Sequence, residues 1–352
     1  MLEKLTKEAI ELLKNLISKQ SFSGEEDETA LLIMQWFSDH TIQFERVKNN
    51  VWAKNRHFNP SKKTILLNSH HDTVKPNKGY TRNPLSPAIE DGKLYGLGSN
   101  DAGGCLVSLL ATFTYFYERE DLKYNFVIVA SAEEENSGPN GLNSMLKIIP
   151  EIDFAIVGEP TLMQLAIAEK GLMVLNCEAK GTPGHAAHGT GDNAIYNAIE
   201  DINWFQNFEF PKVSETLGKV KMTVTQIEAG NQHNVIPSHC KYVVDVRVTD
   251  AYSNQEVFEI IDANVKSEVC PRSLRLNSSS IPKEHPIVQA GIKLGRETYG
   301  SPTLSDQAVL SCPSLKLGPG QSLRSHTADE FIYLNEIEEG IDLYIKLLEE
   351  II

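Results

Sequence analysis

The chain has 352 residues, enough for two domains, and its 41% hydrophobic and 23% charged residues are typical of a globular protein. A formal net charge of −14 argues against binding to nucleic-acid phosphates and to anionic membrane surfaces. The five cysteines form no CxxC pair, which predicts reduced thiols. We find no signal peptide and no apolar run of the roughly 20 residues that a membrane span needs. We therefore expect a cytoplasmic protein that has neither nucleic-acid nor membrane partners.

The first half of the chain alternates helical segments with short apolar runs. Apolar residues recur at helical spacing in residues 2–17, and the sequence SGEE at 23–26 can form a capping box that opens a second helix. Three strand-like runs follow, TILLNS, NFVIVAS and FAIVGE, with a long helical segment from Ala102 between the first two. Because these runs alternate little between apolar and polar residues, they predict strands buried on both faces of a mostly parallel α/β sheet.

The pattern changes after Glu169. A half-exposed strand, a helix, two strands, a helix and a short last strand, SLRLN at 273–277, give the order β-α-β-β-α-β of ferredoxin-like domains. From residue 282 onward the chain returns to helix, strand and helix. We therefore expect residues 1–169 and 282–352 to form a catalytic α/β domain, into which residues 170–281 insert a ferredoxin-like domain.

Ionisable side chains follow the predicted strands or open the long helix. A histidine and an aspartate at positions i and i+2 can act together, since a carboxylate often orients a metal-binding histidine. Taken singly, each of these residues also fits a polar loop, a helix N-cap or a solvated turn. The candidates are His70, Asp72, Asp101, Glu134, Glu135, Glu159 and His326.

The position of these candidates predicts a metal site. In open α/β sheets, ligands bind beyond the carboxyl ends of the strands. Two imidazoles with several carboxylates and no thiolate pair suit Zn²⁺ or Co²⁺. A single catalytic zinc typically takes three protein ligands, so the whole set predicts two metals about 3.5–4 Å apart, bridged by a carboxylate and a water.

Five motifs, in order and at suitable spacing, resemble the M20 family of co-catalytic zinc aminoacylases and exopeptidases. They are SHHDTV, YGLGSNDAGG, SAEEE, VGEPT and GPGQSLRSHTADE. The chain looks most similar to the branch of acetylornithine deacetylase and succinyl-diaminopimelate desuccinylase, and the resemblance extends to GTPGHAAHGTGDNAI and NVIPSHCKYVVDVR in the inserted domain. It implies two Zn²⁺ ions, for which Co²⁺ can substitute. In this ligand set Asp101 bridges the metals, His70 and Glu159 complete one site, and Glu135 and His326 complete the other.

The resemblance also implies roles for residues that do not bind metal. Asp72 orients the first histidine ligand, and Glu134 is the general base that activates a hydroxide bridging the metals. His185 matches a histidine that reaches the active site of the neighbouring subunit and polarises the carbonyl, so a homodimer is expected in which the inserted domain acts as lid and dimerisation domain. Asn234 and Arg247 match positions that contact the substrate, where a guanidinium can pair with an α-carboxylate.

The expected activity is that of a metal-dependent amidohydrolase. It would remove an acetyl or succinyl group from an amino acid such as ornithine or citrulline, in arginine biosynthesis. Two alternatives stay open. A dipeptidase or aminopeptidase of the same family would use the same metals on a substrate with a free amino terminus. A non-catalytic metal-dependent protein that binds a small molecule would be expected to lose the general base, yet Glu134 is present.

Overall fold

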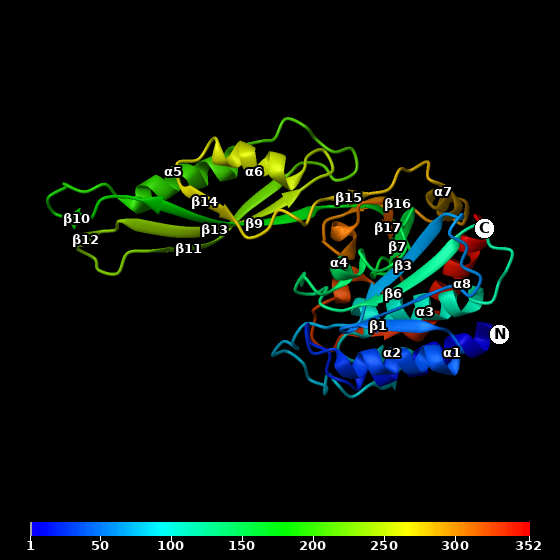
Figure 1. Ribbon diagram of the computed structural model, residues 1–352. Helices are drawn as coiled ribbons and strands as arrows, with labels where there is room; N and C mark the ends of the chain where they lie inside the picture. The colour runs from blue at the N-terminus through cyan, green and yellow to red at the C-terminus, as the bar shows by residue number, and fades with distance from the viewer. Residues whose placement is uncertain (1) are drawn as a thin grey trace. The chain divides into compact units, whose positions relative to one another are not determined.

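The computed structural model describes residues 2–352, which form two compact units (Figure 1). The first unit comprises residues 2–167, Ser280–Tyr299 and Ser305–Ile352, and the second comprises Ala168–Ser279 with Gly300–Leu304. We expected the boundaries two residues later, and we expected residues 300–304 in the catalytic domain. This short segment instead belongs to the second unit, because the amide of Lys170 donates to the carbonyl of Ser301 (3.1 Å).

A nine-stranded sheet forms the centre of the first unit. Its order is β1-β2-β6-β3-β7-β17-β8-β15, and β16 also pairs with β8. The four central strands β6, β3, β7 and β17 run parallel, while antiparallel strands flank them on both sides. The mostly parallel α/β sheet is thus confirmed. The strands are β1 (Phe44–Val47), β2 (Asn50–Lys54), β3 (Thr64–His70), β6 (Asn125–Ser131), β7 (Phe154–Val157), β8 (Leu165–Glu169), β15 (Ser279–Ser280), β16 (Thr298–Ser301) and β17 (Ser314–Lys316).

Helices cover both faces of this sheet, which explains why its strands show little alternation. In β6, Phe126 and Ile128 pack into the larger core, and Val127 and Val129 pack into a smaller core on the opposite face. The larger core is covered by α1 (Leu2–Ile17), α2 (Asp27–Asp39), α3 (Gly104–Phe116), α7 (Pro286–Lys293) and α8 (Leu334–Glu349). The helix α4 (Leu142–Met145) contributes to the smaller core. Figure 1 shows α1 and α2 side by side beneath the sheet.

The capping box expected at residues 23–26 is wrong. The N-cap of α2 is Glu26, whose side chain makes no capping hydrogen bond. The hydroxyl of Ser23 donates instead to Asp72 (2.7 Å), and the carboxylate of Glu26 accepts a hydrogen bond from the amide of Glu133 (3.1 Å). Both side chains therefore support the turn after β6 rather than the start of the helix.

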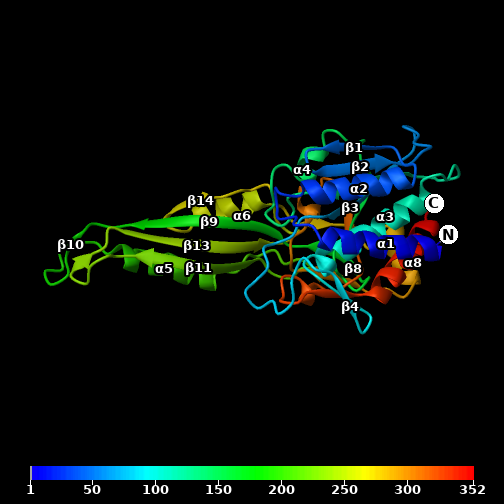
Figure 2. The same ribbon diagram turned by 90° about the horizontal axis from the view of Figure 1, so that it is seen from below.

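The second unit has the expected ferredoxin-like order. Its antiparallel sheet is arranged β11-β13-β9-β14, and α5 and α6 pack on one face through a shared apolar core (Figure 2). In β9 buried residues alternate with more exposed ones, as expected for a sheet covered on one side. The elements are β9 (Gly171–Lys180), α5 (Ala194–Asn207), β11 (Lys221–Ala229), β13 (His239–Val248), α6 (Asn254–Asp262) and β14 (Glu268–Pro271).

The last strand of this unit lies earlier in the chain than predicted. It is β14, and the residues SLRLN at 273–277 follow it as a loop. The loop is held by the start of α6, because the amide of Asn254 donates to Oδ1 of Asn277 (2.9 Å) and the Asn254 side chain donates to the carbonyl of Leu276 (2.8 Å). These hydrogen bonds to Asn254 therefore hold the five residues as a loop, although their alternating apolar pattern favours a strand.

The remaining elements are short. A three-stranded sheet of β4 (Ala88–Glu90), β5 (Lys93–Tyr95) and β18 (Phe331–Tyr333) was not expected, nor was the ladder of β10 (Gly184–His185) and β12 (Val235–Ile236). Single turns of helix are η1 (Ser99–Gly103), η2 (Asp306–Val309) and η3 (Ser322–Arg324). Over residues 2–352, no helix combines the length and the apolar character that crossing a lipid bilayer requires.

Candidate metal centre

The seven candidates of the first unit come together at the carboxyl edge of the parallel strands. The strands β6, β3 and β7 are neighbours, and the side chains that end or follow them therefore meet at one edge. The turn η1 and the loop after η3 contribute the other two. By element, the residues are His70 and Asp72 at the end of β3, Glu134 and Glu135 after β6, Glu159 after β7, Asp101 in η1, and His326 after η3.

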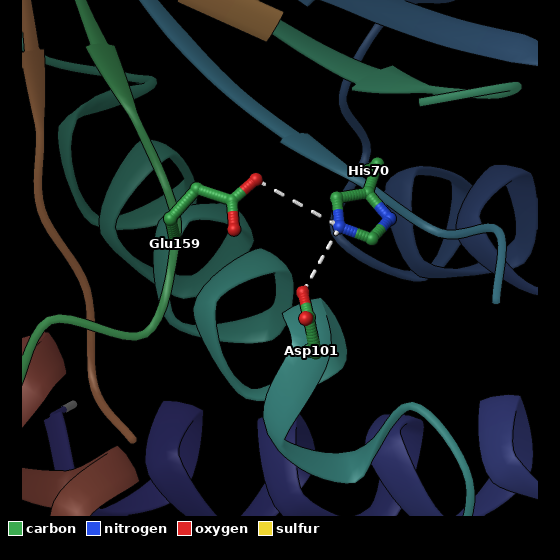
Figure 3. A group of neighbouring side chains, drawn as sticks. All are labelled: His70, Asp101 and Glu159. Carbon is green, nitrogen blue, oxygen red and sulfur yellow. Dashed lines mark hydrogen bonds and ion pairs between the residues drawn. The ribbon is translucent and has the colours of Figure 1, made fainter. Parts of the chain in front are cut away.

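Two groups of three ligands share Asp101. In the first group, Nε2 of His70 lies 3.3 Å from Oδ1 of Asp101 and 3.8 Å from Oε1 of Glu159. Figure 3 shows both carboxylates directed at this one nitrogen. In the second, Nε2 of His326 lies 3.0 Å from Oε2 of Glu135 and 3.7 Å from Oδ2 of Asp101. The ligand atoms of each group lie within 4.8 Å of one another, so Asp101 offers one oxygen to each of two neighbouring cation positions.

Asp72 supports more of the site than the histidine alone. Nδ1 of His70 lies 3.0 Å from the backbone carbonyl oxygen of Asp72 and 3.3 Å from its Oδ1, so both the backbone and the carboxylate of Asp72 orient the ring. The two carboxylate oxygens also accept hydrogen bonds from the amides of Glu134 and Glu135 (3.1 Å each). Although burial raises the pKa of Asp72, its hydrogen bond and charge interaction with His70 outweigh burial and lower the pKa overall. One buried carboxylate therefore positions a ligand and the turn that carries the proposed base.

Glu330 is a supporting residue that sequence reasoning missed. Its buried carboxylate accepts hydrogen bonds from the amides of Gly98, Asn100 and Asp101 (3.0, 2.9 and 2.9 Å) and so holds η1. Burial, reinforced by the nearby Asp101 carboxylate, raises the pKa of Glu330 to about 8 in spite of these bonds. The available signal was its position four residues after His326, in HTADE.

Two other carboxylates complete the surroundings of the turn after β6. Glu133, which is not among the candidates, accepts hydrogen bonds from the backbone amide (3.1 Å) and side chain (2.9 Å) of Asn140 and closes this loop. Asp306 accepts a hydrogen bond from the hydroxyl of Ser131 (2.5 Å) at the end of β6. Of the three consecutive glutamates, Glu133 is therefore structural, and only the next two enter the cluster.

The electrostatics of the cluster fit a cation. Burial raises the pKa of Glu134 well above its usual value, and burial together with the Asp101 carboxylate raises that of Glu159 to about 8. Burial opposes a charge on His70, but its hydrogen bonds to carboxylates win and raise its pKa well above normal. The hydrogen bond to Glu135 raises the pKa of His326 to about 9. The raised pKa values mean that, without a metal, bound protons offset the negative charge of the clustered carboxylates. Divalent cations offset the same charge when they bind to such ligand sets.

The other three predicted site residues belong to the second unit. His185 in β10 is exposed and pairs with Val235 in β12, and the amide of the next residue, Ala186, donates to the carbonyl of Asn234 (3.0 Å). His185 and Asn234 are thus brought together, on neighbouring segments of the same short ladder.

Arg247 lies at the other end of this unit. It pairs with Leu172 at the start of β9, whereas β13 begins eight residues earlier at His239, beside the distal end of β9. At 3.4 Å per residue this separation is roughly 27 Å. The guanidinium of Arg247 makes two hydrogen bonds to the carboxylate of Asp245 (2.8 and 3.1 Å). In the second unit of a single chain, Arg247 is therefore far from His185 and Asn234.

A three-layer α/β unit with two ligand groups around a shared carboxylate is the arrangement of hydrolases that use two metals. The family model of peptidase family M20/M25/M40 matches residues 66–350, and the chain belongs to this family. It is 28% identical to an acetylornithine deacetylase of Erwinia tasmaniensis, over 96% of each chain. It is 22% identical to succinyl-diaminopimelate desuccinylase 2 of Ruegeria sp., over 97% of this chain and 94% of that one.

A solved structure shows the same fold. The YXEP protein of Bacillus subtilis, described as a dinuclear metal-binding peptidase of the M20 family, superposes with a TM-score of 0.74 over 98% of both chains, at 17% identity. Similarity at these levels establishes family and fold, and the family is one of hydrolases. Similarity at these levels does not identify the substrate or the metal, which depend on the side chains of this protein.

Proposed function

We propose that this protein is a two-metal amidohydrolase that removes an acetyl or succinyl group from an amino acid such as ornithine or citrulline, in arginine biosynthesis. The observation that carries the proposal is the pair of ligand groups that share Asp101, with the half-buried Glu134 carboxyl 3.9 Å from Nε2 of His70. Relatives that match nearly the whole chain are named for the removal of acetyl and succinyl groups, which favours an acyl amino acid as substrate.

The ligand set suits two Zn²⁺ ions, with Co²⁺ able to substitute. His70, Glu159 and Asp101 would hold one ion, and Asp101, Glu135 and His326 the other, using the imidazole and carboxylate ligands that these metals accept. When bound, the metals lower the pKa of water towards neutrality and polarise the amide carbonyl.

Glu134 would move the proton in this reaction. It takes a proton from the attacking water as the new oxygen–carbon bond forms at the amide carbonyl. It then delivers that proton to the nitrogen as the carbon–nitrogen bond breaks, releasing the amine and a carboxylic acid, which loses its remaining proton to the amine. Its burial favours such an exchange, because burial raises the carboxyl pKa towards the operating pH. Asp72 fixes the backbone of Glu134 in place throughout.

The second unit would supply recognition. Arg247 can release Asp245 and pair with the substrate α-carboxylate, while His185 and Asn234 can donate hydrogen bonds to the carbonyl. Arg247 lies roughly 27 Å along β13 from His239, at the end of the strand that leads to Asn234 and its neighbour His185, so a single subunit's second unit cannot place all three on the same small substrate. We infer a homodimer, in which His185 and Asn234 of one subunit complete the site of the other.

The second candidate is a dipeptidase or aminopeptidase. It is favoured by the match to peptidase family M20/M25/M40, because such an enzyme would use the same metals and the same base on a peptide amide. A non-catalytic metal-dependent binding protein is disfavoured, since such a protein has no use for the Glu134 carboxyl beside the ligands.

The deciding experiment measures amine release by the purified protein, before chelation and after Zn²⁺ or Co²⁺ is restored. The substrates are N-acetyl- and N-succinyl-ornithine, the matching citrullines, N-succinyl-diaminopimelate and several dipeptides. Metal-dependent turnover of one acyl amino acid supports the proposal and names the substrate. Turnover of dipeptides alone replaces it with the peptidase. Metal binding without any turnover favours the binding protein.

A further inference from the structure

The first unit contains a cavity that is separate from the metal centre. Its volume is about 460 Å³, within the range that small-molecule sites occupy. One face of α8 lines it together with the loops around residues 162–163, 294–296 and 319–320. None of the residues that we assign to the metals or to proton transfer is in its lining. The cavity combines apolar side chains, among them Met163, Leu294 and Leu343, with charged ones.

Arg296 is the lining residue that needs a partner. Its Nε is buried and has no hydrogen-bond partner within residues 2–352. The neighbouring charges are matched, because Lys346 pairs with Asp342 (2.5 Å) and Glu336 pairs with Arg324 outside the cavity (2.7 Å). A guanidinium that is partly buried without an acceptor is unfavourable, and it is the usual protein group for binding a carboxylate.

The same cavity holds a carboxylate without a cation. The side chain of Glu339 accepts a hydrogen bond from Asn335 (3.3 Å), and within the described residues it makes no ion pair. Arg296 and Glu339 therefore offer one positive and one negative group to the same space, beside apolar side chains. We propose that this cavity binds a free amino acid as a zwitterion, with its carboxylate on Arg296, its ammonium group on Glu339 and its side chain against the apolar lining.

The walls of the cavity are connected to both ligand groups of the metal centre. Leu162, in its lining, follows Glu159 by three residues. Glu336, also in its lining, forms the ion pair that holds Arg324, two residues before His326. An amino acid that joins α8 to these loops therefore acts on the segments that position Glu159 and His326. The inference goes beyond the proposed function and predicts that occupation of the cavity changes metal affinity.

The first test needs no turnover. The protein is screened by thermal shift against the twenty coded amino acids, and the best binder is measured by calorimetry beside analogues that lack one charged group. For L-leucine these are 4-methylpentanoate and 3-methylbutylamine. We expect the amino acid to bind at least about tenfold more tightly than either analogue, since each analogue leaves one cavity charge unpaired. The absence of any binder, or equal affinity for the analogues, overturns the proposal.

Variants locate the binding. Arg296→Gln and Glu339→Gln should each weaken it at least about tenfold, while Arg56→Gln, which removes an arginine from an exposed ion pair with Glu118, should leave it unchanged. Thermal melts will show whether either cavity variant is misfolded, and the other variant then still tests the site. Asp101→Asn in the metal centre should retain binding. Loss of binding in Asp101→Asn, or retention in both cavity variants, places the amino acid elsewhere and refutes the site.

Coupling is tested by linkage. Titration with Co²⁺, followed by its visible absorption, should give a different metal affinity with and without a saturating amino acid, and Arg296→Gln should abolish the difference. Equal metal affinities in both titrations would refute the coupling, even where the cavity is occupied.

Discussion

The two units hold their proposed functional residues in opposite ways. In the first unit, the side chains of the base and of every ligand except the exposed His326 are at most 13% exposed. Carboxylates that accept hydrogen bonds from backbone amides fix the segments that carry these residues: Asp72 holds the turn after β6, and Glu330 holds η1. In the second unit, His185 and Asn234 are exposed, and Arg247 is engaged with a neighbouring aspartate. The first site is therefore preorganised for chemistry, whereas the residues of the second need a substrate or a partner subunit to acquire their role.

The largest expected effect lies in the preorganised unit. Glu134→Gln should lower kcat by roughly 10²–10⁴-fold, because the amide cannot accept the proton of water. Metal content, measured by atomic absorption, should stay at the wild-type value, because Glu134 is outside both ligand groups. Glu133→Gln is the matched control at the adjacent position and should keep kcat near wild type. A comparable loss of kcat in both variants would contradict the assignment of the base.

A mixed-dimer experiment tests the exposed residues. His185→Ala should lower kcat/KM by roughly 10²-fold, the size of effect that loss of a donor to the developing oxyanion produces, with unchanged melting because the side chain is exposed. When this variant is exchanged with Glu134→Gln, half of the dimers are mixed and each has one intact site, so about a quarter of wild-type activity should return. If no activity returns in confirmed mixed dimers, His185 acts within its own subunit or has no catalytic role.

Asp72 should matter for metal binding more than for the base alone. Asp72→Asn should weaken metal affinity by roughly 10–100-fold, measured by competition with a chelator, because asparagine keeps one acceptor oxygen, and the NH2 group in place of the other cannot accept from a backbone amide. Ser23→Ala removes one hydrogen bond to the same carboxylate and should cost only about 1 kcal/mol of stability. If Ser23→Ala weakened metal affinity as much as Asp72→Asn, the proposed role of Asp72 in orienting His70 would be contradicted.

The smallest effect is on the pH dependence of stability in the metal-free protein. The pKa values of His326 (about 9) and Glu159 (about 8) both lie above those of the unfolded chain, so near pH 7–8 the native state holds more protons. The stabilisation from His326 is complete below about pH 6.5 and that from Glu159 below about pH 4.5, and both are lost as pH rises to 8–9. Urea unfolding should show the free energy of unfolding falling over pH 6.5–9. Restored metal should flatten this slope, and an equally steep slope with metal would contradict the ligand assignment.

Much of the first unit was predictable because its signals are local. Apolar runs without alternation gave strands buried on both faces, and ionisable residues at their ends gave the candidate ligands. The errors arose where a side chain found a distant partner. SGEE did not cap α2 because the Ser23 hydroxyl bonds to Asp72, 49 residues away. The alternating pattern of SLRLN predicts a strand, but these residues form a loop because Asn254 makes hydrogen bonds to Leu276 and Asn277 that the pattern does not indicate.

The sequence by itself determined which elements form, in which order, and which residue types stand at the strand ends, because periodicity and ligand chemistry are properties of short segments. Only the tertiary structure decided that Asp101 offers one oxygen to each ligand group, that Glu330 holds Asp101 from 229 positions away, and that Arg296 and Glu339 share a cavity. The physical reason is that burial and hydrogen-bond partners, which set the role and pKa of a carboxylate, depend on contacts between segments far apart in the chain.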